Sequence, residues 1–482
     1  MGASGRVVMV SHRAPVEVEP DGGGGRMKRT VGGLATALTD ALRAPGGTWV
    51  AWAGEAAPDV LVPDATGLSF PIRAVPLDRH EIDNYYAGFA NQVLWPLCHI
   101  FPDRCHFRPA FWESYQHANE RFAGAVRAEV RRGDLVWVND FHLCLVPGLL
   151  RASAVPARLG IFWHIPFPPP AVFGICRWRA ELLAGLLGAD VIGLQTAADA
   201  RNFAACVRQF LELPILDDPL RVRLPGRDVH LLVLPVGVDA ARFRAQAADP
   251  AIREQAARVR ANLGTDLVCL GVDRLDYTKG IIERLLGFEA FLERHPSWRG
   301  RVGLLQITVP SRFRVPDYRD MKRTIDETVG RIVGRFTHEG RAPLAYLYTA
   351  FDHEELAAYY VAADVALVTP LRDGMNLVAK EYVACHAGGD GVLVLSEFAG
   401  AADELREALL VNPWDAQTIR RQIDLAVTMT DGERRRRMGA LAARVCARDV
   451  RWWAAAFLAA LADGADASPE ARHDDLELPG LA

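Results

Sequence analysis

The 482-residue sequence has no long apolar run and no strong excess of charge of either sign. A helix needs about 20 apolar residues to cross a bilayer, so the sequence predicts no membrane span. The formal net charge of −4 comes from 55 basic and 59 acidic residues that are interspersed along the chain. Because nucleic acids and anionic membranes attract basic surfaces, we expect neither as a partner.

Paired cysteine and histidine motifs are also missing. The eight cysteines stand singly in apolar segments without a CxxC pair, and the thirteen histidines show no HExxH spacing. The sequence therefore predicts reduced core cysteines in a cytoplasmic protein, no metal site and no cofactor. The first residues lack the apolar stretch of a signal peptide, and MGASGR has Arg6 where a myristoylation signal has Ser or Thr.

What the sequence does contain is a series of short apolar runs between helical stretches. Hydrophobicity is continuous within each run, which is typical of strands buried on both faces and therefore of parallel sheets. The runs are Val7–Val10, Leu135–Val138, Leu159–Trp163, Val191–Leu194, Leu231–Leu234, Leu267–Gly271, Val302–Ile307, Val365–Thr369 and Val392–Leu395. A polar, alanine-rich stretch from Asp239 to Ala261 separates the first five from the last four.

This pattern predicts an α/β fold with two doubly wound, Rossmann-like parallel-sheet domains that face each other across a cleft. We expect the first domain to cover residues 1–237 and the second to cover 238–462. Residues 463–482 are acidic and poor in bulky apolar side chains, so they are predicted to be a disordered tail. Just before them, RWWAAAFLAALA has aromatic and aliphatic residues at helical spacing and predicts a final helix.

The segment Asp364–Glu381, DVALVTPLRDGMNLVAKE, passes from an apolar strand through a glycine turn into a helix. Unpaired N–H groups at a helix start favour a diphosphate. Gly374, which follows Asp373, lets the backbone approach a ligand closely, and Glu381 lies where a carboxylate suits the two hydroxyls of a ribose. Strand-loop-helix units with a glycine are common, so this segment alone is a weak indication of a nucleotide site.

A second segment of this kind, LVCLGVDRLDYTKG, places Arg274 and Lys279 just after a buried strand. The guanidinium can fork onto phosphate oxygens, and the ammonium is a mobile point charge, so the pair suits a diphosphate leaving group. The alternative is that these cations form surface salt bridges with Asp273 or Asp276.

These two segments resemble those of the trehalose-6-phosphate synthase family of retaining glycosyltransferases. Further matches follow in the same order along the chain, from about residue 7 to about residue 460: VSHRAP and GGLA near the start, YYAGFANQVLWP, WVNDFHL, FWHIPFP and VLSEFAGAADEL. The resemblance implies the GT-B fold. It also implies transfer of glucose from UDP-glucose to glucose 6-phosphate, which yields α,α-trehalose 6-phosphate and UDP.

The resemblance, together with the two loops, predicts three groups of site residues. The catalytic residues are Asp140, His164, Arg274 and Lys279. The donor-binding residues are Gly32, Gly33, Arg274, Lys279, Phe351, Asp373, Gly374, Met375, Asn376, Leu377, Val378, Ala379, Lys380 and Glu381. The acceptor-binding residues are Arg13, Tyr86, Trp95, Asp140 and Arg312, in which two arginines and a phenol suit a phosphate dianion.

His164 invites a general-base interpretation, which the family mechanism does not need. Retention in this family is usually explained by front-face internal return, in which the leaving diphosphate oxygen accepts the proton of the incoming hydroxyl. The predicted task of Arg274 and Lys279 is then to neutralise the departing diphosphate. The glycine-rich, basic stretch Gly22–Arg29 is expected to be a mobile loop that closes over bound nucleotide.

Two departures from the family pattern leave alternatives open. Position 12 is His in VSHRAP where the family commonly has Asn, and the loop after Arg13 differs in length and glycine content. The acceptor could therefore also be glycerol 3-phosphate, a pseudosugar or a sugar phosphate other than glucose 6-phosphate. The donor could also be ADP-glucose or GDP-glucose. A non-catalytic sugar-phosphate sensor is a third interpretation, which the retained charged residues disfavour. The sequence does not decide whether the chain forms a homo-oligomer, and it shows no DxDxT motif of a fused phosphatase.

Overall fold

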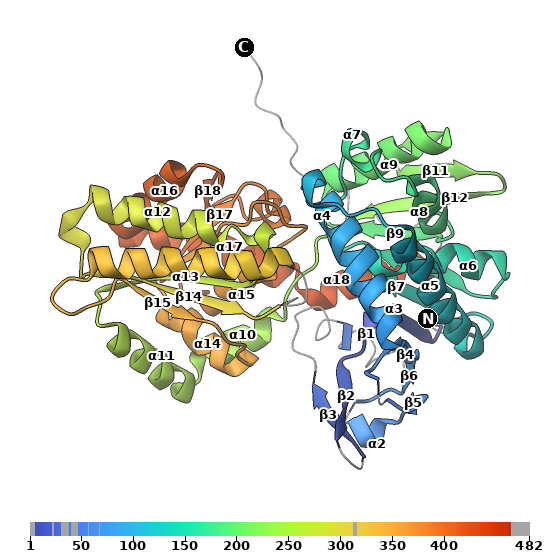
Figure 1. The fold of residues 1–482 in the computed structure, drawn as a ribbon, viewed down its shortest axis with the longest axis horizontal. Coiled ribbons are helices and arrows are strands. Elements are labelled where there is room, and N and C mark those ends of the chain that lie inside the picture. The colour runs from blue at the N-terminus through green and yellow to red at the C-terminus, as the bar shows by residue number, and fades with distance from the viewer. Residues whose placement is uncertain are drawn as a thin grey trace.

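The computed structural model describes residues 5–21, 24–29, 38–39, 47–55, 57–66, 68–311 and 316–463. Its two large sheets lie side by side, each with helices packed against it (Figure 1). Three predicted site residues, Gly32, Gly33 and Arg312, lie outside the described residues. So does the predicted tail, except for Asp463, which ends the last helix.

The first sheet has its long parallel strands in the middle and short antiparallel strands at its edges. Its order is β10 (Ile215–Asp217), β11 (Leu220–Leu224), β12 (Arg227–Val233), β9 (Val191–Leu194), β8 (Arg158–Phe162), β7 (Leu135–Asn139), β1 (Val7–Arg13), β4 (Gly47–Trp52), β6 (Ile72–Ala74) and β5 (Val60–Leu61). All residues of β7 and β9 are buried, as continuous apolar runs predict.

The second sheet is parallel throughout its described strands. Its order is β15 (Leu344–Leu347), β14 (Val302–Val309), β13 (Leu267–Arg274), β16 (Val365–Val368), β17 (Val392–Ser396) and β18 (Leu409–Val411). All nine strands expected from the sequence are present, and the two-domain Rossmann-like prediction is confirmed.

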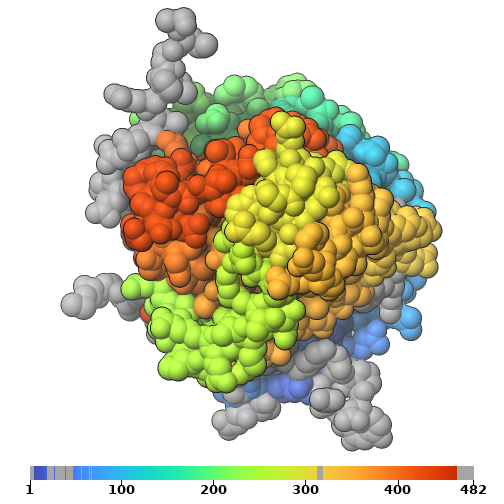
Figure 2. Space-filling view, turned by 90° about the vertical axis from the view of Figure 1, so that its left-hand side faces the viewer, coloured from blue at the N-terminus to red at the C-terminus, as the bar shows by residue number. Residues whose placement is uncertain are grey.

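Helices cover both sheets and connect their parallel strands. In the first half of the chain they are α2 (Pro63–Thr66), α3 (Arg79–Glu81), the π-helix η1 (Ile82–Leu94), α4 (Trp95–Cys98), η2 (Pro102–Arg104), α5 (Pro109–Glu129), η3 (Phe141–Leu143), α6 (Val146–Ala152), α7 (Pro170–Phe173), α8 (Arg179–Leu186) and α9 (Ala197–Leu211). In the second half they are α10 (Ala240–Ala248), α11 (Pro250–Leu263), η4 (Tyr277–Lys279), α12 (Ile281–Arg294), η5 (Pro296–Trp298), α13 (Pro316–Phe336), α14 (His353–Ala362), α15 (Leu377–Cys385), η6 (Gly400–Asp403), α16 (Ala416–Thr428), α17 (Asp431–Ala447) and α18 (Val450–Asp463). Figure 2 views the second domain from outside, where α11, α12 and α13 form much of its surface.

Each sheet has a topological switch point, where successive strands are added on opposite sides of a central strand. In the first sheet, the chain moves from β1 to β4 on one side and from β7 to β8 on the other. In the second, β14 lies on one side of β13 and β16 lies on the other. Crevices at the carboxyl ends of such strand pairs are where open α/β sheets bind ligands.

Most of the stretch predicted to be a mobile loop has regular secondary structure. Gly24–Arg29 forms a strand, β3, which pairs with β2 (Val16–Asp21) in an antiparallel hairpin, and closure of this hairpin over bound nucleotide stays a prediction. The register places acidic Glu17 and Glu19 opposite basic Lys28 and Arg26. This pairing could not be read from the glycine content alone.

The last helix, α18, packs against the first sheet although it follows the second in sequence (Figure 1). The ring of Trp453 lies 5.1 Å from that of Trp137 in β7, and Phe457 lies 4.7 Å from the same tryptophan. Gly160 in β8 makes room for this contact, because an added Cβ would lie 3.0 Å from the Phe457 ring. No helix among the described residues has the length and apolar character to cross a membrane.

Candidate active site

Predicted site residues gather at the carboxyl edge of both sheets. Arg13 ends β1, Asp140 follows β7 and His164 follows β8, which are neighbouring strands of the first sheet. In the second sheet, Arg274 ends β13 and Asp373 follows β16 after a short turn. The central strands of each sheet thus present polar side chains at the edge where ligands bind.

Contacts across the domains show that these two edges face each other. The guanidinium carbon of Arg274 lies 5.6 Å from the centre of the Trp95 ring. A Cβ added to Gly374 would lie 2.4 Å from the carbonyl oxygen of His164, so only glycine permits this approach. The close backbone contact of Gly374 is therefore with the first domain, whereas the sequence led us to expect it with a ligand.

On the acceptor side, Arg13 lies beside two aromatic rings. Its guanidinium carbon is 5.3 Å from the ring centre of Tyr86 and 5.7 Å from that of Trp52. Cation–π contacts of this kind orient a guanidinium through its flat face, and its N–H edge stays suited to an anion. Tyr86 belongs to η1, and π-helical segments are rare and often occur at functional sites.

His12 is buried behind this pair and adds no positive charge to it. Its ring stacks on Tyr86 at 4.4 Å and on His142 at 5.0 Å. Burial, followed by the positive charges of His142 and Arg13, holds the pKa of His12 well below its usual value. The histidine at this position therefore acts as a neutral aromatic side chain that supports Tyr86.

Asp140 has an unusual backbone and an unusually weak acid group. Its φ of 75° and ψ of 169° lie in a region that only glycine adopts readily, so the surrounding structure holds this backbone under strain. Its Oδ1 accepts a hydrogen bond of 3.2 Å from the N–H of His164. Burial raises the pKa of Asp140 from 3.8 to about 7, although the backbone N–H groups of Phe141 and His164 and the charge of Arg274 oppose the rise.

His164 lies next to Asp140 and is held as a neutral ring. Its Nε2 is 3.1 Å from the Oδ1 of Asn139, and because an amide oxygen only accepts, Nε2 carries the hydrogen. Burial lowers the pKa of His164 to about 3. A group with so low a pKa takes up a proton poorly near neutral pH, so the geometry does not favour His164 as a general base.

The two donor-side cations differ in their surroundings. Lys279 is nearly buried and donates a 2.6 Å hydrogen bond to the Oδ2 of Asp373. Burial alone would raise the pKa of Asp373, but this ammonium, together with His99 and Asn376, holds it below its usual value. Arg274 is 46% exposed, with Nη2 4.0 Å from a carboxylate oxygen of Asp276. The alternative of local salt bridges therefore fits Arg274 in part, whereas Lys279 pairs with a residue of the other predicted donor loop.

Arg284, which the sequence analysis missed, contacts both donor loops, the one after β13 and the one after β16. Its side chain is fully buried, forms an ion pair of 2.5 Å with Asp273 and donates to the hydroxyl of Thr369 at 3.1 Å. Its third nitrogen, Nη2, lies 3.4 Å from the carbonyl oxygen of Lys279. The signal was present in the sequence, because Arg284 stands among Ile and Leu residues on the apolar face of α12.

The start of α15 faces the site with a strained cap residue. Asn376 has a φ of 96°, and its side chain accepts a hydrogen bond of 3.0 Å from the N–H of Ala379. The N–H groups of Leu377 and Val378, in the first turn, have no intrahelical acceptor. Met375 is buried in the core just before the cap. The helix start can thus direct two backbone donors and its positive dipole end toward an anion.

Three further predicted donor residues are placed by the structure in different ways. Glu381 is buried and accepts a 2.6 Å hydrogen bond from the hydroxyl of Tyr360. Phe351 is half-buried against Tyr359, with ring centres 4.7 Å apart. The ammonium of Lys380 is buried in an ion pair with Glu404, so this side chain holds the fold and is not directed to a ligand.

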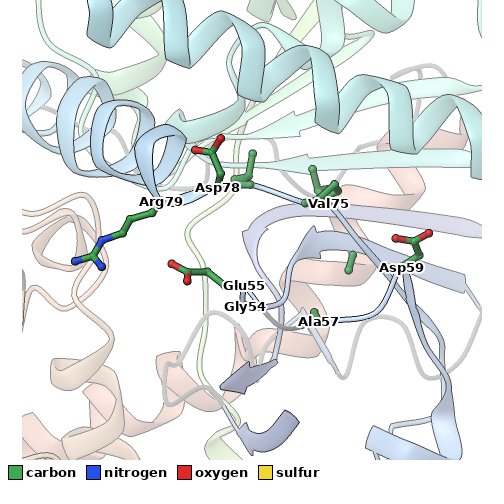
Figure 3. Close-up of a pocket in the computed structure, with 10 residues that line it drawn as sticks. Gly54, Glu55, Ala57, Asp59, Val75, Asp78 and Arg79 are labelled. Carbon is green, nitrogen blue, oxygen red and sulfur yellow. The ribbon is translucent and has the colours of Figure 1, made fainter. Parts of the chain in front are cut away.

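A pocket of about 380 Å³ lies at the carboxyl ends of β4 and β6. Glu55 and Arg79 extend from it toward the same side, while Asp59 lies at its other end (Figure 3). None of the predicted site residues that the structure describes lines this pocket. Its carboxylates disfavour a phosphate, which leaves Arg13 as the better anchor for one. Among the described residues, no group of three or more His, Cys, Asp and Glu side chains is arranged to hold a metal ion.

Comparison with known proteins assigns the family. The model of glycosyltransferase family 20 matches residues 5–463. The chain belongs to glycosyltransferase family 20. It is 43% identical to the trehalose-6-phosphate synthase of Mycolicibacterium smegmatis over 467 residues, which cover 94% of this chain and 92% of that protein. It is 41% identical to a bifunctional trehalose-6-phosphate synthase/phosphatase of Thermoproteus tenax, of which it spans 64% of the length.

Solved structures of this family share the fold over most of the chain. An α,α-trehalose-phosphate synthase (UDP-forming) from Burkholderia xenovorans, in complex with glucose 6-phosphate, has a TM-score of 0.86 at 34% identity and covers 95% of this chain and 100% of its own. An Escherichia coli protein bound to UDP-2-fluoro glucose has the same TM-score and identity and covers 95% of this chain and 99% of its own. The GT-B fold expected from the sequence is thereby confirmed.

Proposed function

We propose that the protein is a retaining glucosyltransferase that transfers glucose from UDP-glucose to glucose 6-phosphate, giving α,α-trehalose 6-phosphate and UDP. The observation that carries this proposal is the placement of cationic groups on both sides of one interdomain site. Arg13 lies at the edge of the first sheet, and Arg274 and Lys279 lie at the facing edge of the second. Relatives named for this reaction support the same conclusion.

The acceptor phosphate is assigned to Arg13 and Tyr86. A guanidinium and a phenol can both donate to a phosphate dianion, and the flat contact between them fixes the direction of the guanidinium. The sequence adds Arg312 to this group by resemblance. Asp140, at the end of the neighbouring strand, is assigned to the sugar hydroxyls, and Trp95 is assigned to the wall of the acceptor pocket.

The donor diphosphate is assigned to Arg274, Lys279 and the start of α15, with Gly32 and Gly33 added by resemblance. Lys279 reaches the phosphate by exchanging its bond to Asp373 for one to the diphosphate, which frees that carboxylate for the hydroxyls of glucose. Glu381 is assigned to the ribose hydroxyls. We propose UDP-glucose as the donor, with uracil as its base. ADP-glucose and GDP-glucose serve as alternative donors in the test.

The chemical step that we propose takes place on one face of the glucose ring. The bond between C1 and the β-phosphate oxygen breaks, and C1 forms a new bond to the anomeric hydroxyl oxygen of the acceptor. The proton of that hydroxyl passes to the leaving phosphate oxygen, so the step needs no protein nucleophile. Arg274 and Lys279 stabilise the charge that develops on the diphosphate, and His164 stays neutral beside the reacting sugar.

The domain limits and location of the protein are proposals of the same kind. We propose domains at 1–237 and 238–462, a division supported by the gap between β12 and α10 and by the return of α18 to the first sheet. We propose a cytoplasmic location, supported by eight free cysteines.

Product analysis by NMR tests the proposed reaction. The purified protein is incubated with UDP-glucose and glucose 6-phosphate, and in parallel with UDP-glucose and glycerol 3-phosphate. A 1,1-linked α,α disaccharide phosphate from the first mixture is the expected result. Product from the second mixture alone would overturn the acceptor assignment. No product from either, with ADP- and GDP-glucose also tried, would favour a sugar-phosphate sensor.

A further inference from the structure

One short segment of the first domain, residues 95–104, contacts the donor loop of the second domain at several points. Trp95 lies against Arg274, with 5.6 Å between the guanidinium carbon and the ring centre. At the other end of the segment, the ring of Phe101 meets the edge of Tyr277 at 5.3 Å. Arg104 lies over the same tyrosine at 4.6 Å. The segment therefore spans the donor loop from one end to the other.

His99 stands in the middle of this segment and is not accounted for by the proposed chemistry. Its ring is 2% exposed and lies 4.1 Å from the ring of Trp95. Its Nδ1 is 2.8 Å from the carbonyl oxygen of Trp95, so Nδ1 carries the hydrogen and Nε2 is an acceptor. Within the described parts of the chain, Nε2 is buried and has no hydrogen-bond partner. Buried polar atoms without a partner are rare in folded proteins and call for an explanation.

The charges around His99 come from the second domain. Burial lowers the pKa of His99 to about 4, and Asp276, Lys279 and Asp373 also act on it. The ring is therefore neutral at physiological pH and presents a lone pair on Nε2, and the ammonium of Lys279 is one of the charges that act on it. That ammonium has three hydrogens, and its bond to Asp373 uses one of them.

We propose that His99 is a positioning residue that couples the acceptor site to the donor site. On one side it holds Trp95, which is assigned to the acceptor pocket, in place against Arg274. On the other side its Nε2 offers an acceptor to Lys279 when the diphosphate draws that ammonium away from Asp373. Binding of the acceptor thereby favours the arrangement of donor cations that binds the nucleotide. This inference rests on the proposed function, because it takes the two sites from it.

Calorimetric titration with UDP, in the absence and presence of saturating glucose 6-phosphate, tests the coupling. For the wild type we expect glucose 6-phosphate to tighten UDP binding about fivefold or more. His99→Phe keeps a flat ring against Trp95 but removes both nitrogens, so the ratio of the two affinities should fall to about one. His99→Gln places an amide near the position of Nε2 and should restore part of the ratio.

Leu97→Ala is the matched control, because Leu97 lies in α4 two residues before His99, is fully buried and carries no polar group. It should lower the melting temperature and leave the affinity ratio unchanged. The inference would be overturned if His99→Phe kept the wild-type ratio of UDP affinities with and without glucose 6-phosphate. It would also be overturned if Leu97→Ala lost this ratio to the same extent as His99→Phe. Product formation by the wild type is measured on the same preparation. Normal product with an unchanged ratio in His99→Phe would refute this inference alone, whereas no product would refute the proposed function.

Discussion

Replacing Asp140 by Asn should stabilise the protein at neutral pH, although it removes a proposed substrate ligand. Burial raises the pKa of Asp140 from 3.8 to about 7, so the folded protein resists loss of this proton. Asn resembles the protonated acid and cannot ionise. Asn and Asp have the same shape at Cβ and Cγ, so the substitution leaves the backbone strain at φ 75° and ψ 169° unchanged.

The pH range in which Asp140→Asn stabilises the protein follows from the pKa of Asp140 in the folded and unfolded states. Between about pH 4 and pH 7 the folded protein holds a proton on Asp140 that the unfolded chain has lost, so wild-type stability falls as pH rises through this range. The full shift corresponds to about 4 kcal/mol. Because 14% of the side chain is exposed, we expect the variant to gain about 2 to 4 kcal/mol above pH 7.

Urea unfolding of both proteins at pH 4, 6 and 8 measures this gain. The difference in unfolding free energy should be near zero at pH 4 and largest at pH 8. Asp266→Asn is the control, since Asp266 is 57% exposed, and it should change stability by less than about 0.5 kcal/mol at each pH. An Asp140→Asn variant that is less stable than the wild type at pH 8, or a difference that does not vary with pH, would refute the reasoning.

Three further predictions concern activity and the core. The kcat/KM of the wild type should rise with pH toward a plateau above about pH 7, because ionised Asp140 accepts from a sugar hydroxyl; a flat profile from pH 5 to pH 8 would contradict this. Arg274→Ala should lower kcat about 100- to 1000-fold and weaken UDP binding, while Arg258→Ala, at a surface ion pair, should change neither in the same assays. Trp453→Ala should lower the free energy of unfolding by about 3 to 5 kcal/mol in urea titrations, and Trp452→Ala, which is less buried, should cost less.

The sequence predicted the central strands of both sheets better than their edges. Nine buried strands have continuous apolar runs, and all nine lie in the structure close to the predicted residues. Strands β10 and β11, the outer two strands at one end of the first sheet, were missed because they are short and mix polar with apolar residues. The β2–β3 hairpin was missed because β3 begins with two glycines, and glycine is uncommon in strands.

The sequence by itself determined the strand positions and the motifs at their ends, because both are local properties of residue type and spacing. Only the tertiary structure decided which of these residues meet. It brought Arg274 over Trp95, paired Lys279 with Asp373 and buried His99 among charges from the other domain. Such contacts depend on how two separately folded sheets face each other. The burial that shifts the pKa of Asp140 likewise arises only when the surrounding elements pack around it.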